Sequence, residues 1–74
     1  MKHMEYIRKT YNVPAKRGAR IEYDGDEVTK FLMGFLYTPR KGTIVSARNG
    51  YIRVRFDGSD FIQSFHPTWR IKYV

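Results

Sequence analysis

The clearest pattern in the chain is a regular alternation of apolar and polar residues on both sides of the dipeptide Asn49-Gly50. Residues 43–48 and 51–56 both alternate with a period of two, which is typical of β-strands that bury one face. Asn-Gly supplies the two positive φ angles of a type I′ turn, so these segments are predicted to form a tight hairpin. The cross-strand pairs that this turn predicts are Arg48–Tyr51, Ala47–Ile52, Ser46–Arg53 and Val45–Val54.

In this register the predicted hairpin has one apolar and one polar face. The face predicted to lie on the core carries Thr43, Val45, Ala47, Ile52, Val54 and Phe56. The opposite face carries Ile44, Ser46, Arg48, Tyr51, Arg53 and Arg55. A slip of one residue would place the arginines in the core, so we expect the register to be strict.

Shorter strands are predicted on either side of the hairpin. Residues 19–23 alternate between apolar and charged side chains, and the segment 24–26 ends this strand. After the hairpin, residues 57–60 make a tight connection into a strand over 61–65. The sequence His66-Pro67-Thr68 is typical of a short 3-10 turn, and a last strand is predicted over 69–73.

The segment between Asp26 and Lys41 fits two structures. Asp26 suits a helix N-cap, and Pro39 lies beyond the helix end. Against a helix, Gly34 would cost about 1 kcal/mol in its interior. We therefore predict a long loop with short extended pieces, and a helix of one or two turns is the alternative. The apolar residues with helical spacing are Val28, Phe31, Leu32, Phe35 and Leu36.

These elements together predict an all-β fold. They describe a small SH3-like barrel of about five short antiparallel strands, with a long first loop and a 3-10 turn before the last strand. The chain has 74 residues, which is enough for one domain and not for two. Residues 14–74 are predicted to form that domain, because Pro14 interrupts any preceding helix. Residues 1–13 are predicted to be a leader that packs onto it.

Three motifs occur in the order expected for a known group of domains. A basic turn opens the first strand in residues 16–21, a glycine opens the second in 42–45, and Tyr-Ile-Arg-Val-Arg-Phe-Asp-Gly follows in 51–58. In this order the sequence resembles KOW and Tudor-type SH3-like domains. The ending from His66 to Trp69 is similar to small phage and prophage proteins of unassigned function. The resemblance covers roughly residues 14–74 and implies a family whose members bind nucleic acid or protein.

The charge of the chain is large and unevenly distributed. Fourteen Lys and Arg face seven Asp and Glu, which gives a net charge of +7. Most acids fall in residues 22–27 or at Asp57 and Asp60, whereas the stretch from Val28 to Phe56 has six basic residues and no acid. Such a field attracts polyanions, with nucleic acid the first among them.

The polar face of the hairpin is the main candidate site. Its arginines are spaced about 7 Å apart along the strand, and a guanidinium binds phosphate through two parallel hydrogen bonds. Tyr51 offers a ring on which a base can stack. The alternative is a solvated face whose long side chains only cover apolar neighbours. With the basic turns included, the predicted nucleic-acid-binding residues are Lys16, Arg17, Arg20, Arg40, Lys41, Arg48, Tyr51, Arg53 and Arg55.

Other chemistry has little support in the sequence. Without Cys and with only His3 and His66, no disulfide, metal site or cofactor is predicted. No nucleophile or carboxylate pair accompanies His66 at a recognisable spacing, so the protein is predicted not to be an enzyme. The acidic run 22–27 lacks the spacing of a calcium loop and is predicted to be a polar loop. Three aromatic residues are assigned to the core, namely Phe61, Phe65 and Trp69.

The distribution of apolar residues also bears on localisation. No stretch approaches the ~20 apolar residues that a membrane span needs, and residues 1–10 lack the apolar block of a secretory signal. We therefore predict a cytoplasmic protein with neither a membrane partner nor a small-molecule substrate.

The sequence thus predicts a nucleic-acid-binding accessory module that holds DNA or RNA by arginine–phosphate contacts. The alternative is a protein-interaction module, for instance a phage-type factor that docks on an acidic host protein. The oligomeric state is left open, because the hairpin edge and the apolar residues 31–37 each offer a surface to a second copy.

Overall fold

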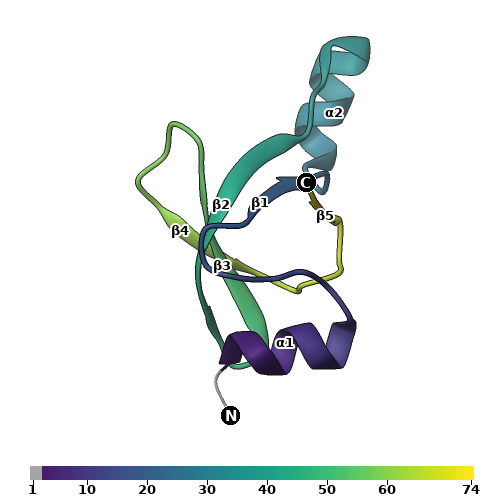
Figure 1. Ribbon diagram of the computed structural model, residues 1–74. Helices are drawn as coiled ribbons and strands as arrows, with labels where there is room; N and C mark the ends of the chain where they lie inside the picture. The colour runs from purple at the N-terminus through teal and green to yellow at the C-terminus, as the bar shows by residue number, and fades with distance from the viewer. Residues whose placement is uncertain (1–2) are drawn as a thin grey trace.

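The computed structural model describes residues 3–74 as a sheet flanked by helical segments (Figure 1). The helical elements are α1 (His3–Tyr11), α2 (Glu27–Met33) and the 3-10 turn η1 (Gly34–Leu36). The strands are β1 (Arg20–Tyr23), β2 (Arg40–Arg48), β3 (Tyr51–Phe56), β4 (Ile62–Phe65) and β5 (Ile71–Tyr73).

The five strands form one antiparallel sheet in the order β4-β3-β2-β1-β5. The short strands β4 and β5 lie at opposite edges, and within residues 3–74 no ladder joins them. The sheet is therefore open, and the prediction of an all-β, SH3-like barrel is wrong. Two features explain the difference. The leader and the segment after β1 both contain helices, and the edge strands, of four and three residues, stay apart.

Helix α1 was expected only as a leader, and it contributes directly to the core. Ile7 is fully buried, and Met4 and Tyr11 lie one helical turn away on either side, packed against the same cluster. Asn12 ends the helix with a φ of 53°, a left-handed conformation that asparagine tolerates. The buried cluster consists of Ile7, Ala15, Ile21, Ile44, Ile52, Val54 and Phe56.

The hairpin confirms the predicted register near its turn and departs from it farther away. Arg48–Tyr51, Ala47–Ile52 and Ser46–Arg53 pair as expected, and a β-bulge then makes Ile44, not Val45, the partner of Val54. The bulge adds one residue to β2 and reverses the alternation beyond it. The predicted core positions of Thr43 and Val45 are therefore wrong, and Ile44 is fully buried instead. The arginines of β3 still lie on the opposite face.

The segment after β1 adopts the helical alternative, so the predicted long loop is wrong. The Asp26 carboxylate caps α2 by accepting hydrogen bonds from the Thr29 backbone N–H at 3.1 Å and from its hydroxyl at 2.7 Å. These bonds, the hydroxyl one first, lower the pKa of Asp26. Gly34 ends the helix at a φ of 57° and begins η1. The objection to a helix assumed an interior Gly34, but this glycine is the C-cap, where its freedom is useful.

The chain between β4 and β5 turns at Pro67-Thr68 as expected, but it forms a hydrogen-bonded turn there and not the predicted 3-10 turn. The Trp69 backbone N–H donates to the carbonyl of His66 at 3.3 Å, and the last strand begins at Ile71 rather than at residue 69. The Tyr73 hydroxyl donates back to the carbonyl of Pro67 at 2.9 Å. This bond ties the last strand to the turn that precedes it.

Alkaline pH should test the environment of Tyr73. Burial raises the pKa of this phenol from 10.0 to about 12. Between these values the unfolded chain binds fewer protons than the folded one, so the free energy of unfolding should fall as the pH rises. Tyr73→Phe should flatten this decline in urea unfolding measured from about pH 9 to pH 12, whereas Tyr51→Phe, at an exposed ring, should retain it. If the free energy of unfolding falls equally with pH in both variants, Tyr73 is not buried as described.

Candidate functional site

The side of the sheet that faces away from the buried cluster, called here the outer face, carries most of the basic residues predicted to bind. Because residues opposite each other in a ladder share a face, the register places them row by row. The outer-face residues are Arg20, Glu22, Lys41, Thr43, Ser46, Arg48, Tyr51, Arg53, Arg55, Ile62, Ser64 and Lys72.

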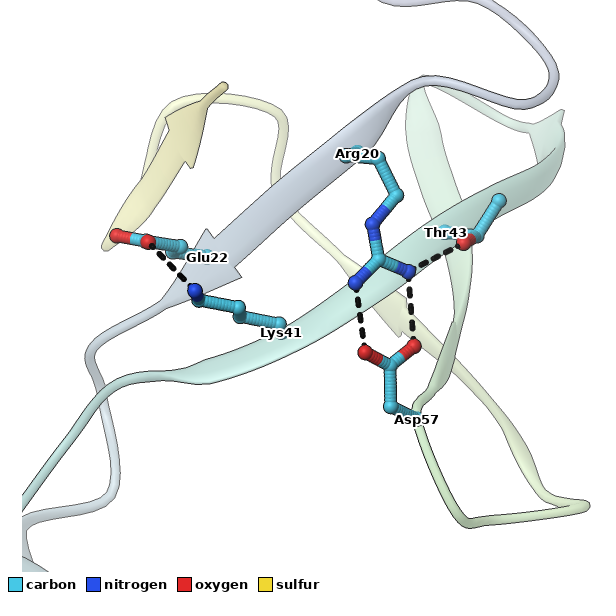
Figure 2. Close-up of polar contacts among 5 residues, drawn as sticks. All are labelled: Arg20, Glu22, Lys41, Thr43 and Asp57. Carbon is cyan, nitrogen blue, oxygen red and sulfur yellow. Dashed lines mark hydrogen bonds and ion pairs between the residues drawn. The ribbon is translucent and has the colours of Figure 1, made fainter.

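At one end of the outer face, the basic residues are paired with acids. Arg20 donates from its two terminal guanidinium nitrogens to the Asp57 carboxylate, at 2.8 Å and 2.6 Å, and to the Thr43 hydroxyl at 2.8 Å. Figure 2 shows these contacts beside a longer pair between Lys41 and Glu22 at 4.0 Å. Hydrogen bonding within the Arg20–Asp57 pair raises the pKa of Arg20 and lowers that of Asp57. Arg20 is thus already satisfied by an acid and is less available to a phosphate.

The middle of the outer face has arginines that are not engaged in this way. Within residues 3–74, Arg48, Arg53 and Arg55 make no ion pair. The residues beside Arg53 are Ser46 and Ser64, and those beside Arg55 are Thr43 and Ile62, all of them uncharged. Their guanidinium groups therefore keep their full hydrogen-bonding capacity for an anion.

At the hairpin end, where the outer face borders α1, Tyr51 meets a group of aromatic rings. The His66 ring stacks on Trp69 with 4.3 Å between centroids and 14° between planes. Tyr11 and Tyr51 meet the His66 ring edge-on, at 4.9 Å and 6.4 Å. The Thr68 backbone N–H donates to His66 Nδ1 at 3.2 Å, which fixes the orientation of the imidazole. A hollow of about 340 Å³ beside these rings is lined by His3, Tyr6, Tyr11, Asn49, Gly50, Tyr51 and His66.

The assignment of three aromatic residues to the core is largely wrong. Phe65 packs against the buried cluster, but Trp69 is 69% exposed and Phe61 is 77% exposed. Trp69 follows a turn rather than occupying a strand, so strand alternation gave no information about its side. The candidate residues that the predicted binding set leaves out are Trp69, His66 and Lys72. A signal was present for the first two, because they stand three residues apart across the turn at Pro67.

Three predicted site residues lie off the outer face. Arg40 pairs with Tyr23 and places its guanidinium carbon 4.0 Å from the centroid of the Phe56 ring, which is a cation–π contact on the core side. Lys16 and Arg17 lie exposed in the turn before β1. Arg17 lines a hollow with Ser46 and with residues of α1, at the border of the outer face. Of the predicted set, the structure therefore unites Arg20, Lys41, Arg48, Tyr51, Arg53 and Arg55.

Two further properties of the described residues bear on the site. Between residues 3 and 74, no three His, Asp or Glu side chains are grouped so that they could hold a metal ion. In the same range, no helix has the length and apolar composition needed to cross a membrane.

Comparison of the chain with protein-family models, with curated proteins and with solved structures finds no match. No family is thereby shown. The resemblance to KOW and Tudor-type domains remains a prediction from sequence motifs, and the open sheet contradicts the closed barrel that it implies.

Proposed function

We propose that the protein binds single-stranded nucleic acid on its outer face. The observation that carries the proposal is the row of outward side chains on β3, where Tyr51 is followed by Arg53 and Arg55 with uncharged cross-strand neighbours. This row begins beside the exposed stack of Trp69 on His66. A flexible nucleic-acid strand needs both features, because rings hold its bases and cations hold its phosphates.

The arginines supply the backbone contacts. A guanidinium that has no acid partner gives up no ion pair when a phosphate arrives, whereas Arg20 would first have to leave Asp57. The Ser46 and Ser64 hydroxyls flank Arg53 in the same row and offer further donors. The net charge of +7 draws a polyanion toward the protein and makes its binding sensitive to salt.

The aromatic end supplies base stacking. Trp69 is held against His66 on one side and remains largely exposed, so its ring is oriented without being covered. Stacking of one base on such a ring is worth roughly 1–3 kcal/mol and does not depend strongly on the base. An unpaired strand presents its bases for stacking, whereas a duplex hides them, so we expect single strands to bind more tightly than duplexes.

The test is a titration with fluorescein-labelled single-stranded DNA, single-stranded RNA and duplex DNA at several salt concentrations. Anisotropy reports binding, and fluorescence of Trp69, the only tryptophan of the chain, reports stacking. Arg53→Ala/Arg55→Ala should lower affinity about tenfold. It should also reduce the slope of log K against log salt by about 1.4, since each phosphate contact on a single strand contributes about 0.7.

A second double variant controls for the loss of charge alone. Lys9→Ala/Lys16→Ala also removes two positive charges, but from positions that the strand register does not place on the outer face. It should change affinity much less than the arginine pair. Equal losses in the two variants would show that net charge, not the outer face, controls binding. If no oligonucleotide binds saturably, or if Trp69 fluorescence stays unchanged on binding, the proposal is wrong.

A further inference from the structure

Helix α2 and the turn η1 form an arm that stands away from the sheet (Figure 1). None of their residues is buried. Phe31 is 87% exposed and Phe35 is 96% exposed. The exposed apolar side chains of the arm are Val28, Phe31, Leu32, Met33, Phe35 and Leu36.

The spacing of the apolar residues in the arm is typical of a helix face that packs against another surface. On α2, Val28, Phe31 and Leu32 follow the spacing i, i+3, i+4, which in a globular protein marks the helix face on the core, and Phe35 of η1 follows just beyond the C-cap Gly34. Here this stripe faces solvent, while the polar residue Lys30 turns toward the protein body and binds Asp24 at 2.9 Å. The apolar face of this helix is therefore exposed, although its sequence pattern is that of a helix packed against another apolar surface.

We propose that the arm is a dimerisation element whose six exposed apolar side chains pack against those of a second copy of the chain. When two copies meet across a two-fold axis, the same apolar patch of each copy faces the other, so no second complementary surface is required. Taking about 150–250 Å² for each aromatic and somewhat less for each aliphatic side chain, the six residues present on the order of 800 Å². This is the area that each partner contributes to a standard interface, and it exceeds the apolar patches that monomers usually expose.

The charges at the base of the arm favour a second copy over an anionic membrane. Lys30 is bound by Asp24 at 2.9 Å, and Arg70 is bound by Glu27 at 3.1 Å. Asp26, at the N-cap of α2, and the nearby Arg40 add one charge of each sign. The base therefore has no net charge, so two copies with a large positive charge can approach each other there. A loop that inserts into an anionic bilayer would instead need uncompensated cations beside its apolar tip.

Sedimentation velocity of the full chain over a range of concentrations tests this proposal. The wild type should sediment as a species of twice the 8.8 kDa chain mass. Phe31→Ser/Phe35→Ser should raise the dimer dissociation constant at least tenfold and leave the circular dichroism spectrum unchanged, because neither ring contacts the buried cluster. Phe61→Ser is the matched control, since Phe61 is also highly exposed but lies in the β3–β4 connection, and it should leave the dimer intact.

Spin labels supply a second measurement that does not depend on weakening the arm. The chain has no Cys, so Thr38→Cys beside the arm and Gln63→Cys on β4 each accept one label. Dipolar coupling between two copies should be strong at position 38 and weak at position 63. A wild type that stays monomeric at about 100 µM would overturn the proposal. So would a dimer that survives the double substitution, or a monomer that binds phosphatidylglycerol vesicles through the arm.

Discussion

Replacing Ile7 by alanine is expected to lower the free energy of unfolding by about 3 kcal/mol, within the range of roughly 2–5 kcal/mol for isoleucine-to-alanine changes in cores. Ile7 is fully buried among residues of the sheet. Alanine is the best helix former, so α1 would keep its local preference and lose only the packing. For a domain of this size such a loss is a large part of the total stability.

The measurement is urea unfolding followed by far-ultraviolet circular dichroism. Ile62→Ala provides the matched control, because it is the same substitution at a side chain that is 45% exposed on an edge strand. It should cost well under half as much. Similar small losses in both variants would mean that α1 does not pack on the sheet in solution.

Gly42→Ala is expected to destabilise the protein by about 2 kcal/mol, as overpacked cores typically lose 1–3 kcal/mol. A Cβ at Gly42 would lie 2.8 Å from Val54 Cγ1, 2.9 Å from the Arg55 carbonyl oxygen and 3.1 Å from Phe56 Cδ1. The carbonyl belongs to the neighbouring strand and cannot move without disturbing the ladder. This cost exceeds the gain of about 0.4–1 kcal/mol that alanine brings by restricting the unfolded chain.

The same unfolding experiment applied to the adjacent position supplies the control for Gly42. Lys41→Ala changes an exposed side chain on the same strand and should alter stability by no more than about 0.5 kcal/mol. If Gly42→Ala unfolds at the wild-type urea concentration, then β2 and β3 do not approach as closely as the structure places them. The β-bulge, which brings Gly42 opposite Phe56, would then be in doubt.

The hairpin shows how far local rules reach. Asn49-Gly50 and period-two alternation act over a few residues, so they predicted the turn, three cross-strand pairs and the outward direction of Tyr51, Arg53 and Arg55. The bulge at Val45 lies outside such rules. It depends on how side chains of β2 fill the space beside Val54 and Phe56, which is a property of the assembled core.

In the candidate site, too, one part follows from local sequence rules and the other depends on the fold. Its arginine row follows from alternation along one strand, but its aromatic end depends on where the turn after β4 carries Trp69. A large aromatic residue in a short domain is usually buried, and composition alone therefore pointed to the core. Trp69 and His66 are only three residues apart, but only the fold brings their stack beside Tyr51, which lies fifteen residues before His66.

The sequence by itself determined the strand pattern, the tight turn and the excess of positive charge, because these depend on neighbouring residues and on composition. Tertiary structure alone decided that the sheet stays open, that α1 completes the core, that the apolar stripe of α2 faces outward, and which arginines are already paired with acids. These outcomes depend on contacts between distant segments, where packing volume and competition among charges determine the arrangement that forms.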